Sequence, residues 1–192
     1  ELTHQGLHPY SIPIGGSTAV GALGYIAAYH EIVEQCLALA ISPSTIVCTS
    51  SSGGTHAGLV AGRAWLRTLG TYEVLPRLLA IGVAKGVIAG FPSVRELASE
   101  ALALAGLPGE VTDDDVEVDG SWLGPDYAIP TEASQKASVW AAHAGAWVLD
   151  DVYTAKGMAG LLGHADDGRW ISNDDVIFIH TGGQPEVFVR HD

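Results

Sequence analysis

Basic residues are scarce in this sequence of 192 residues. Nine Lys and Arg side chains stand against 22 Asp and Glu, which gives a formal net charge of −13 at neutral pH. Nucleic acids and anionic membranes are bound through electropositive faces, so this balance argues against both as partners. Only 16% of the residues are charged while 47% are hydrophobic, a composition that excludes intrinsic disorder.

Cysteines and long apolar runs are also scarce. Cys36 and Cys48 are the only two cysteines, too few and too oddly spaced for a disulfide framework or a cysteine metal site. No block of about 20 mainly apolar residues occurs that would span a membrane. A signal peptide is not visible either. We therefore expect reduced thiols, no bound metal and a cytoplasmic location.

Apolar strands alternate with helical segments along the chain. Strands are predicted at 45–49, 78–84, 147–149 and 176–180, and helices at 17–40, 56–69, 92–105, 131–144 and 154–168. This alternation indicates an α/β fold, with an open, mainly parallel, twisted sheet that carries helices on both faces. The acidic stretch 108–120 lacks helical periodicity and is expected to be a loop or a short edge element.

Three glycine-rich segments, at 15–17, 51–55 and 181–183, fall near the ends of extended or strand segments. In open α/β sheets ligands bind beyond the carboxyl ends of the strands. The segment at 51–55 precedes a helix, so its backbone N–H groups can face an anion. It matches neither G-x-G-x-x-G nor the lysine-containing P-loop. It predicts a cradle for the phosphate of a small cofactor, although such a turn can also be purely structural.

Five motifs, in order and along nearly the whole chain, resemble those of one enzyme family. They are PYSIPIGGSTAVGALGY (9–25), SSSGGTHAGL (50–59), GPDYAIPTEA (124–133), DDVYTAKGMAGL (150–161) and VIFIHTGGQPEVF (176–188). They are similar to segments of the pyridoxal-phosphate (PLP) lyases that comprise D-cysteine desulfhydrase and 1-aminocyclopropane-1-carboxylate (ACC) deaminase. These enzymes share the tryptophan-synthase-β-like fold, called fold type II. The region from about 77 to 123 carries no sharp signature of the family.

The resemblance implies roles for individual residues. The cofactor phosphate would be bound by Ser51, Ser52, Gly53, Gly54 and Thr55. Tyr127 and Tyr153 match the two active-site tyrosines, which face the substrate and can transfer protons. Thr154 and Thr181 would lie near the pyridine nitrogen. Thr154 favours a desulfhydrase, because the cyclopropane deaminases carry Glu at this place.

The chain departs from the family in its lysines. Its three lysines are Lys85, Lys136 and Lys156, and none matches the Schiff-base lysine, which family members carry in an N-terminal segment. We expect residues 1–14 to be a crossover from the small domain and 15–192 to be the large cofactor-binding domain. The fold would be incomplete without that N-terminal segment.

Several functions fit this pattern. The first is a PLP-dependent α,β-elimination of a small amino acid such as D-cysteine, with the lysine supplied by a missing segment or a partner subunit, in an oligomer. The missing part would be a separate chain or the other half of a cleaved one. The second is a subunit that binds PLP or phosphate without catalysis. The third is β-replacement or racemisation on the same half-site. Asp126, where the family carries Gly, leaves the substrate open.

Overall fold

Four parallel strands form the centre of the protein. The structure is a computed structural model that describes residues 2–91 and 93–182. The strands are β1 (Thr45–Ser50), β2 (Arg77–Gly82), β3 (Val118–Asp119) and β4 (Val176–Ile179). Their order in the sheet is β3-β2-β1-β4, and each adjacent pair is parallel. β1 therefore lies inside the sheet, where all six of its residues are buried.

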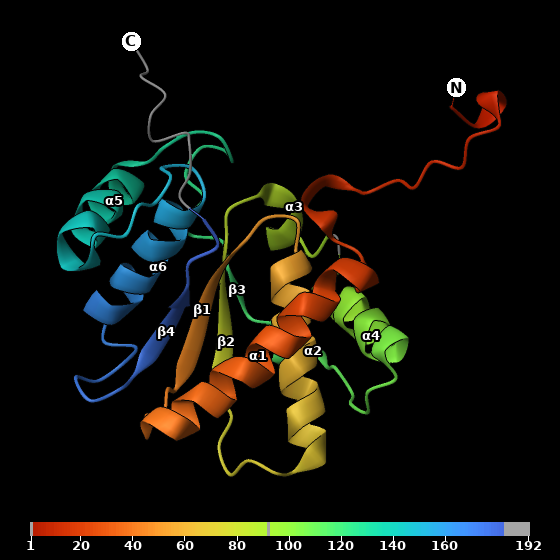
Figure 1. Cartoon of the computed structure of the whole chain (residues 1–192). Helices are drawn as coiled ribbons and strands as arrows, with labels where there is room; N and C mark the ends of the chain where they lie inside the picture. The colour runs from red at the N-terminus through yellow and green to blue at the C-terminus, as the bar shows by residue number, and fades with distance from the viewer. Residues whose placement is uncertain (1, 92, 183–192) are drawn as a thin grey trace.

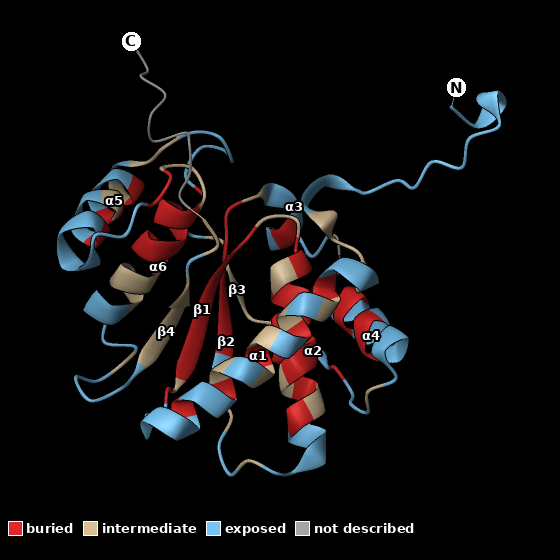
Figure 2. Cartoon of the chain, viewed as in Figure 1, coloured by how far each residue is buried: buried red, intermediate tan, exposed pale blue. Residues whose placement is uncertain are grey.

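Side-chain alternation along the strands produces two apolar layers. Ile46 and Cys48 of β1 join a core cluster with residues of the first helices, whereas Val47, Leu79 and Ile81 belong to a cluster on the opposite face. Successive side chains of a strand point to opposite faces, so strands covered on both sides must be apolar throughout. Figure 1 shows α1, α2 and α4 on one side of the sheet and α5 and α6 on the other, and Figure 2 shows the buried strands between them.

The described residues form six α-helices around the sheet. They are α1 (Ala19–Leu39), α2 (Gly54–Leu69), α3 (Lys85–Ile88), α4 (Val94–Ala105), α5 (Glu132–Gly145) and α6 (Thr154–Asp166), with short 3₁₀ turns at Leu2–Gln5, Ile14–Gly16 and Asp113–Asp115. Side-chain oxygens cap three of the helices: Thr18 accepts from the N–H of Gly21, Ser93 from that of Glu96, and Thr131 from that of Ser134. These caps fix where the helices begin and hence where the preceding loops lie.

The helices α1 and α2 approach closely because α2 has glycines at their contact. A Cβ atom on Gly62 would lie 2.7 Å from Cβ of Tyr29 and 2.9 Å from the carbonyl oxygen of Ile26. Tyr29 is fully buried, and its hydroxyl donates to the carbonyl oxygen of Pro76 at 2.8 Å. This packing fixes α2, which directly follows the glycine-rich loop 51–55.

Most predicted elements are confirmed, and the predicted α/β architecture is observed. The expected strand at 147–149 is wrong: these residues connect α5 to α6 without strand geometry. Their apolar character has another cause, because Leu149 is buried against α5 and α6. The predicted helix at 92–105 begins only at Val94, after the Ser93 cap, and is preceded by the short α3.

The N-terminal residues lie apart from the packed layers. Residues 2–13 are exposed and extend away from the sheet (Figure 1 and Figure 2). The division at residue 14 stays a prediction. Among the helices that the structure describes, none is both long and apolar enough to cross a bilayer.

Candidate active site

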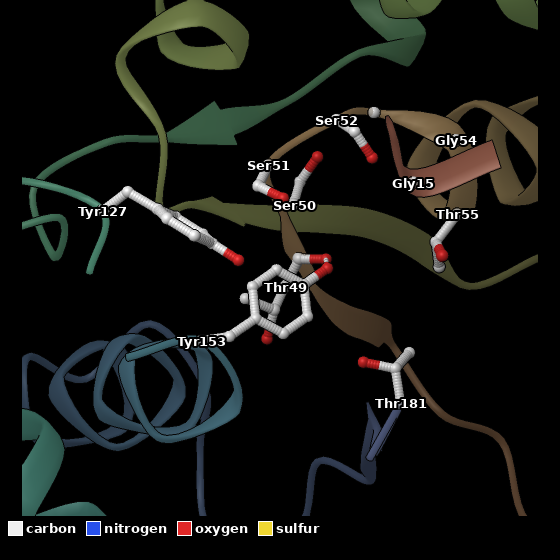
Figure 3. A pocket seen from close by; sticks show the side chains of 11 residues that line it. Gly15, Thr49, Ser50, Ser51, Ser52, Gly54, Thr55, Tyr127, Tyr153 and Thr181 are labelled. Atoms are coloured by element: carbon white, nitrogen blue, oxygen red, sulfur yellow. Dashed lines mark hydrogen bonds between the residues drawn. The ribbon is translucent and has the colours of Figure 1, made fainter. Parts of the chain in front are cut away.

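A polar cavity of about 240 Å³ lies beyond the carboxyl ends of β1 and β4. Parallel strands end at the same edge of a sheet, and residues far apart in the sequence meet there. The cavity is lined by Gly15, Thr49, Ser50, Ser51, Ser52, Gly53, Gly54, Thr55, Tyr127, Tyr153 and Thr181, as Figure 3 shows. It thus contains eight of the nine residues that sequence analysis assigned to the site.

The loop between β1 and α2 has the geometry of an anion cradle. Gly53 adopts a left-handed conformation (φ 84°) at the N-cap of α2, and no side chain hydrogen-bonds to the cap. The first N–H groups of a helix lack partners within the helix and carry its positive dipole end, so an anion satisfies them well. This loop is therefore suited to bind a phosphate group.

A second loop closes on the cradle. A Cβ atom on Gly54 would lie 2.8 Å from the hydroxyl oxygen of Ser17 and 3.2 Å from its Cα atom. The Ser17 hydroxyl donates to the Ser52 hydroxyl at 2.8 Å, which joins the two loops. Gly15, in a left-handed conformation, lines the cavity beside them. Only glycine at 54 allows this close approach.

Three hydroxyls of the cavity are buried without a hydrogen-bond partner in the described part of the chain. They belong to Thr49, Ser50 and Thr181. Buried polar groups are normally paired, and an unpaired one costs about 1–3 kcal/mol. The Thr49 hydroxyl faces Gly157 of α6, so a polar ligand in the cavity would remove that cost at Ser50 and Thr181.

The two tyrosines of the cavity differ in environment. The Tyr153 hydroxyl donates to the carbonyl oxygen of Thr49 at 2.8 Å, and burial raises the pKa of this phenol well above its ordinary value. Tyr127 comes from the loop between β3 and α5 and is 42% exposed. Its ring points toward the cavity (Figure 3). Tyr153 is a fixed neutral donor, whereas Tyr127 faces the open side.

Comparison with known proteins identifies this arrangement. The model of the family described as "Pyridoxal-phosphate dependent enzyme" matches residues 1–182. The chain belongs to this family. The family's cofactor is PLP.

Its relatives specify the branch of the PLP-dependent family. The chain is 36% identical over 193 residues to a D-cysteine desulfhydrase of Salmonella typhi and 35% identical to one of Salmonella newport. All of the chain but only 55% of each relative is covered, so the chain spans about half the length of these curated relatives. A solved structure titled as that of an ACC deaminase homologue is 31% identical to this chain, with a TM-score of 0.79. The match covers 95% of this chain and 52% of the chain in that structure. The predicted fold type II architecture is thereby confirmed.

The residues of this PLP-family site fit the cofactor. PLP carries a phosphate and a pyridine ring, and the cavity combines an N–H cradle with unpaired hydroxyls. Ser51, Ser52 and Thr55 add hydroxyls around the cradle. Thr181 supplies an unpaired hydroxyl from the opposite wall, after β4.

Thr154 is the ninth residue that sequence analysis assigned to the site. It is buried but does not line the cavity. Its hydroxyl donates to Oδ2 of Asp150 at 2.6 Å, and the Asp150 carboxylate also accepts from the N–H groups of Tyr153 and Thr154. This carboxylate thus satisfies N–H groups at the N-terminus of α6, and the Thr154 hydroxyl is one of its partners. That Thr154 lies near the pyridine nitrogen stays a prediction.

Three lining residues were absent from the predicted set. Gly15, Thr49 and Ser50 all lie in segments that the sequence marked as strand ends or glycine-rich loops. The signal that could have found Thr49 and Ser50 is their place as the last residues of a buried strand. Polar residues at such a place face the ligand edge of the sheet.

His56 lies beside the cradle but does not take part in the cavity. It is completely buried in the first turn of α2, and neither ring nitrogen has a partner within the described residues. Burial lowers the pKa of its imidazole to about 4. The described residues contain no cluster of three or more metal-ligating side chains.

Proposed function

We propose that this chain is the cofactor-binding part of a PLP-dependent lyase that catalyses α,β-elimination on a small amino acid such as D-cysteine. One observation carries the proposal: the phosphate cradle, the Thr181 hydroxyl and both tyrosines converge on one cavity. The D-cysteine desulfhydrases among its relatives support the reaction class.

In this proposal the cradle and Thr181 hold the cofactor at its two ends. The N–H groups of Gly54 and Thr55, at the start of α2, bind the phosphate together with the neighbouring serine hydroxyls. The Thr181 hydroxyl would hold the pyridine ring from the opposite wall of the cavity. When bound, PLP supplies an electron sink that stabilises negative charge at the substrate's α-carbon.

The two tyrosines have different roles in this proposal. Tyr127 is partly exposed and free to approach the substrate, so it moves a proton at the reacting atoms. Tyr153 keeps its proton because burial raises its pKa. Its hydroxyl is anchored on Thr49, and its ring walls the cavity and limits water access.

The lysine that anchors the cofactor comes from outside this chain's own three. Lys85 pairs with Asp126 at 2.7 Å, Lys136 pairs with Glu132 at 2.6 Å, and Lys156 donates to backbone carbonyls. None of the three lines the cavity. We therefore propose that a lysine-bearing segment or partner subunit completes the enzyme, and that the complete enzyme is an oligomer.

The same observation favours one alternative: a subunit that binds PLP without catalysis. The two functions differ in whether a lysine reaches the cavity in the native assembly. Only the enzyme requires a lysine-bearing polypeptide that remains associated during purification.

Borohydride reduction of the natively purified protein tests the proposal. PLP is added, the imine is reduced, and modified lysines are mapped by mass spectrometry, with excess inorganic phosphate as a competition control. We expect a phosphate-sensitive adduct on a lysine outside residues 1–192, and release of sulfide from D-cysteine. An adduct only on one of the chain's own three lysines would overturn the assignment. PLP binding with no adduct would support the non-catalytic alternative.

A further inference from the structure

Lys156 is a buried ammonium that pairs with carbonyl oxygens instead of a carboxylate. The residue is completely buried near the start of α6. Its Nζ atom donates to the carbonyl oxygens of Leu123, Asp126 and Tyr127 at 2.7, 2.8 and 3.1 Å. An ammonium has three N–H donors, so all of them are used on one loop.

This arrangement is costly for a residue without a function. Burying a charge carries a large desolvation penalty. A cation in the first turn of a helix also lies at the positive end of the helix dipole. Burial lowers the pKa of Lys156, and the nearby Asp126 opposes that shift. An apolar side chain at this position would avoid these costs.

The acceptor loop does not need the lysine merely to satisfy its carbonyls. Residues 124–127 are exposed, so water can reach this part of the loop. What the ammonium adds is a fixed position, because three short bonds from one atom constrain the loop on α6. Tyr127 belongs to that loop, and its own carbonyl oxygen is one of the three acceptors.

We propose that Lys156 is a positioning residue that sets the place of Tyr127 at the cavity. It rests on the proposed function, in which Tyr127 moves a proton. Through Lys156, α6 holds the loop of one tyrosine while Tyr153, three residues earlier, is anchored on Thr49. Gly157 packs against the Thr49 side chain, which fixes α6 on β1. One helix end thereby sets the spacing of both tyrosines.

A second lysine near this loop interacts with it more weakly. Lys85 bonds the carboxylate of Asp126 from outside, and both side chains are more than half exposed. Exposed ion pairs contribute little and are screened by salt. Lys136 pairs with Glu132 on α5, with both side chains exposed. It therefore provides a matched control.

Hydrogen exchange of the full chain tests the proposal without any ligand. Lys156→Met keeps the length of the side chain and removes the ammonium. We expect amides of residues 122–131 to exchange about tenfold faster or more than in the unmodified chain, with β1 unchanged, since charge-assisted bonds are lost locally. Lys136→Met should match the unmodified chain. Equal exchange of the loop in all three proteins would overturn the proposal.

A ligand readout separates positioning from general structural support. PLP and inorganic phosphate affinities are measured by fluorescence titration and by competition. Lys156→Met should weaken PLP binding about tenfold and leave phosphate binding unchanged, because the cradle lies on other elements. A parallel loss of both affinities would contradict a positioning role. If the unmodified chain binds no PLP, the proposed function fails, while the exchange experiment still decides the role of Lys156.

A pH series on the unmodified chain covers the case in which Lys156→Met does not fold. As pH rises through the lowered pKa of Lys156, the neutral amine keeps only two N–H donors and loses its charge. Asp126, paired with Lys85, is the charged side chain on the facing loop. Tyr153, directly before α6, keeps its proton to higher pH than Lys156 because burial raises its pKa. Exchange of 122–131, corrected for its intrinsic pH dependence, should rise about tenfold as the ammonium loses its proton, while β1 stays protected. A constant ratio would overturn the proposal.

Discussion

Mild acid should destabilise this protein through His56 before its carboxylates are protonated. The imidazole is completely buried and has no hydrogen-bond partner within the described chain, and its pKa is lowered to about 4. In the unfolded chain a histidine has a pKa of about 6.5. The unfolded state therefore binds a proton more readily than the folded state. The contribution to stability is fully present above pH 6.5 and is lost as pH falls toward 4.

The size of this effect follows from the difference between the two pKa values. At pH 5 the unfolded histidine is protonated and the folded one is mostly neutral. One pH unit corresponds to about 1.4 kcal/mol, and pH 5 lies 1.5 units below the unfolded pKa, so the loss is about 2 kcal/mol. Unpaired carboxylates ionise near pH 4, so this window separates His56 from them.

Urea unfolding at pH 7, 6 and 5, followed by tryptophan fluorescence, measures the loss. His56→Leu removes the titrating group from a site where neither ring nitrogen is bonded, so the variant should lose about 2 kcal/mol less between pH 7 and 5. His143→Gln, on the exposed face of α5, should behave like the unmodified chain. If His56→Leu and the unmodified chain lose the same free energy of unfolding, the reasoning is refuted.

Two further substitutions test the cradle and the acidic 3₁₀ turn. Gly54→Ala should weaken PLP binding about tenfold or more in a fluorescence titration, since the new Cβ would lie 2.8 Å from the Ser17 hydroxyl oxygen. Gly24→Ala, with open space around it, should bind PLP as the unmodified chain does. Equal affinities of the two variants would contradict the close-approach argument. Asp115→Asn should lower the free energy of unfolding by about 2–4 kcal/mol, because this carboxylate, 5% exposed, pairs with two arginines. Burial raises the pKa of Asp115, but hydrogen bonds from Arg67 and Thr112 lower it to about 2; its contribution is therefore present above pH 4 and lost toward pH 2. Asp113→Asn, 90% exposed, should cost far less in the same urea assay, and a comparable loss would contradict the role of burial.

Most of the fold could be predicted from the sequence because local sequence patterns agree with the burial of each element. The β-branched run of β1 is buried on both faces, and Thr18 and Thr131 cap the helices predicted at 17–40 and 131–144. The strand predicted at 147–149 is wrong for a specific reason. A run of three apolar residues has the same sequence pattern whether it pairs as a strand or only buries Leu149 in a core. A sequence does not reveal which of these partners exists.

The site was predictable from its motifs, but its side-chain directions were not. The loop 51–55 and both tyrosines follow from position along the chain. The motif places Thr154 next to Tyr153, but only the structure shows that its hydroxyl turns to Asp150. The three carbonyl bonds of Lys156 depend equally on a loop some 30 residues away.

The cavity draws its wall from residues as far apart as Gly15 and Thr181. Such a site exists only once the chain has folded across nearly its whole length, so a ligand there binds the native state and not the unfolded one. At a concentration 100 times its dissociation constant it would add about 2.7 kcal/mol to the free energy of unfolding. Bound PLP would therefore lengthen the lifetime of the folded chain, and a shortage of PLP would lower the abundance of the protein.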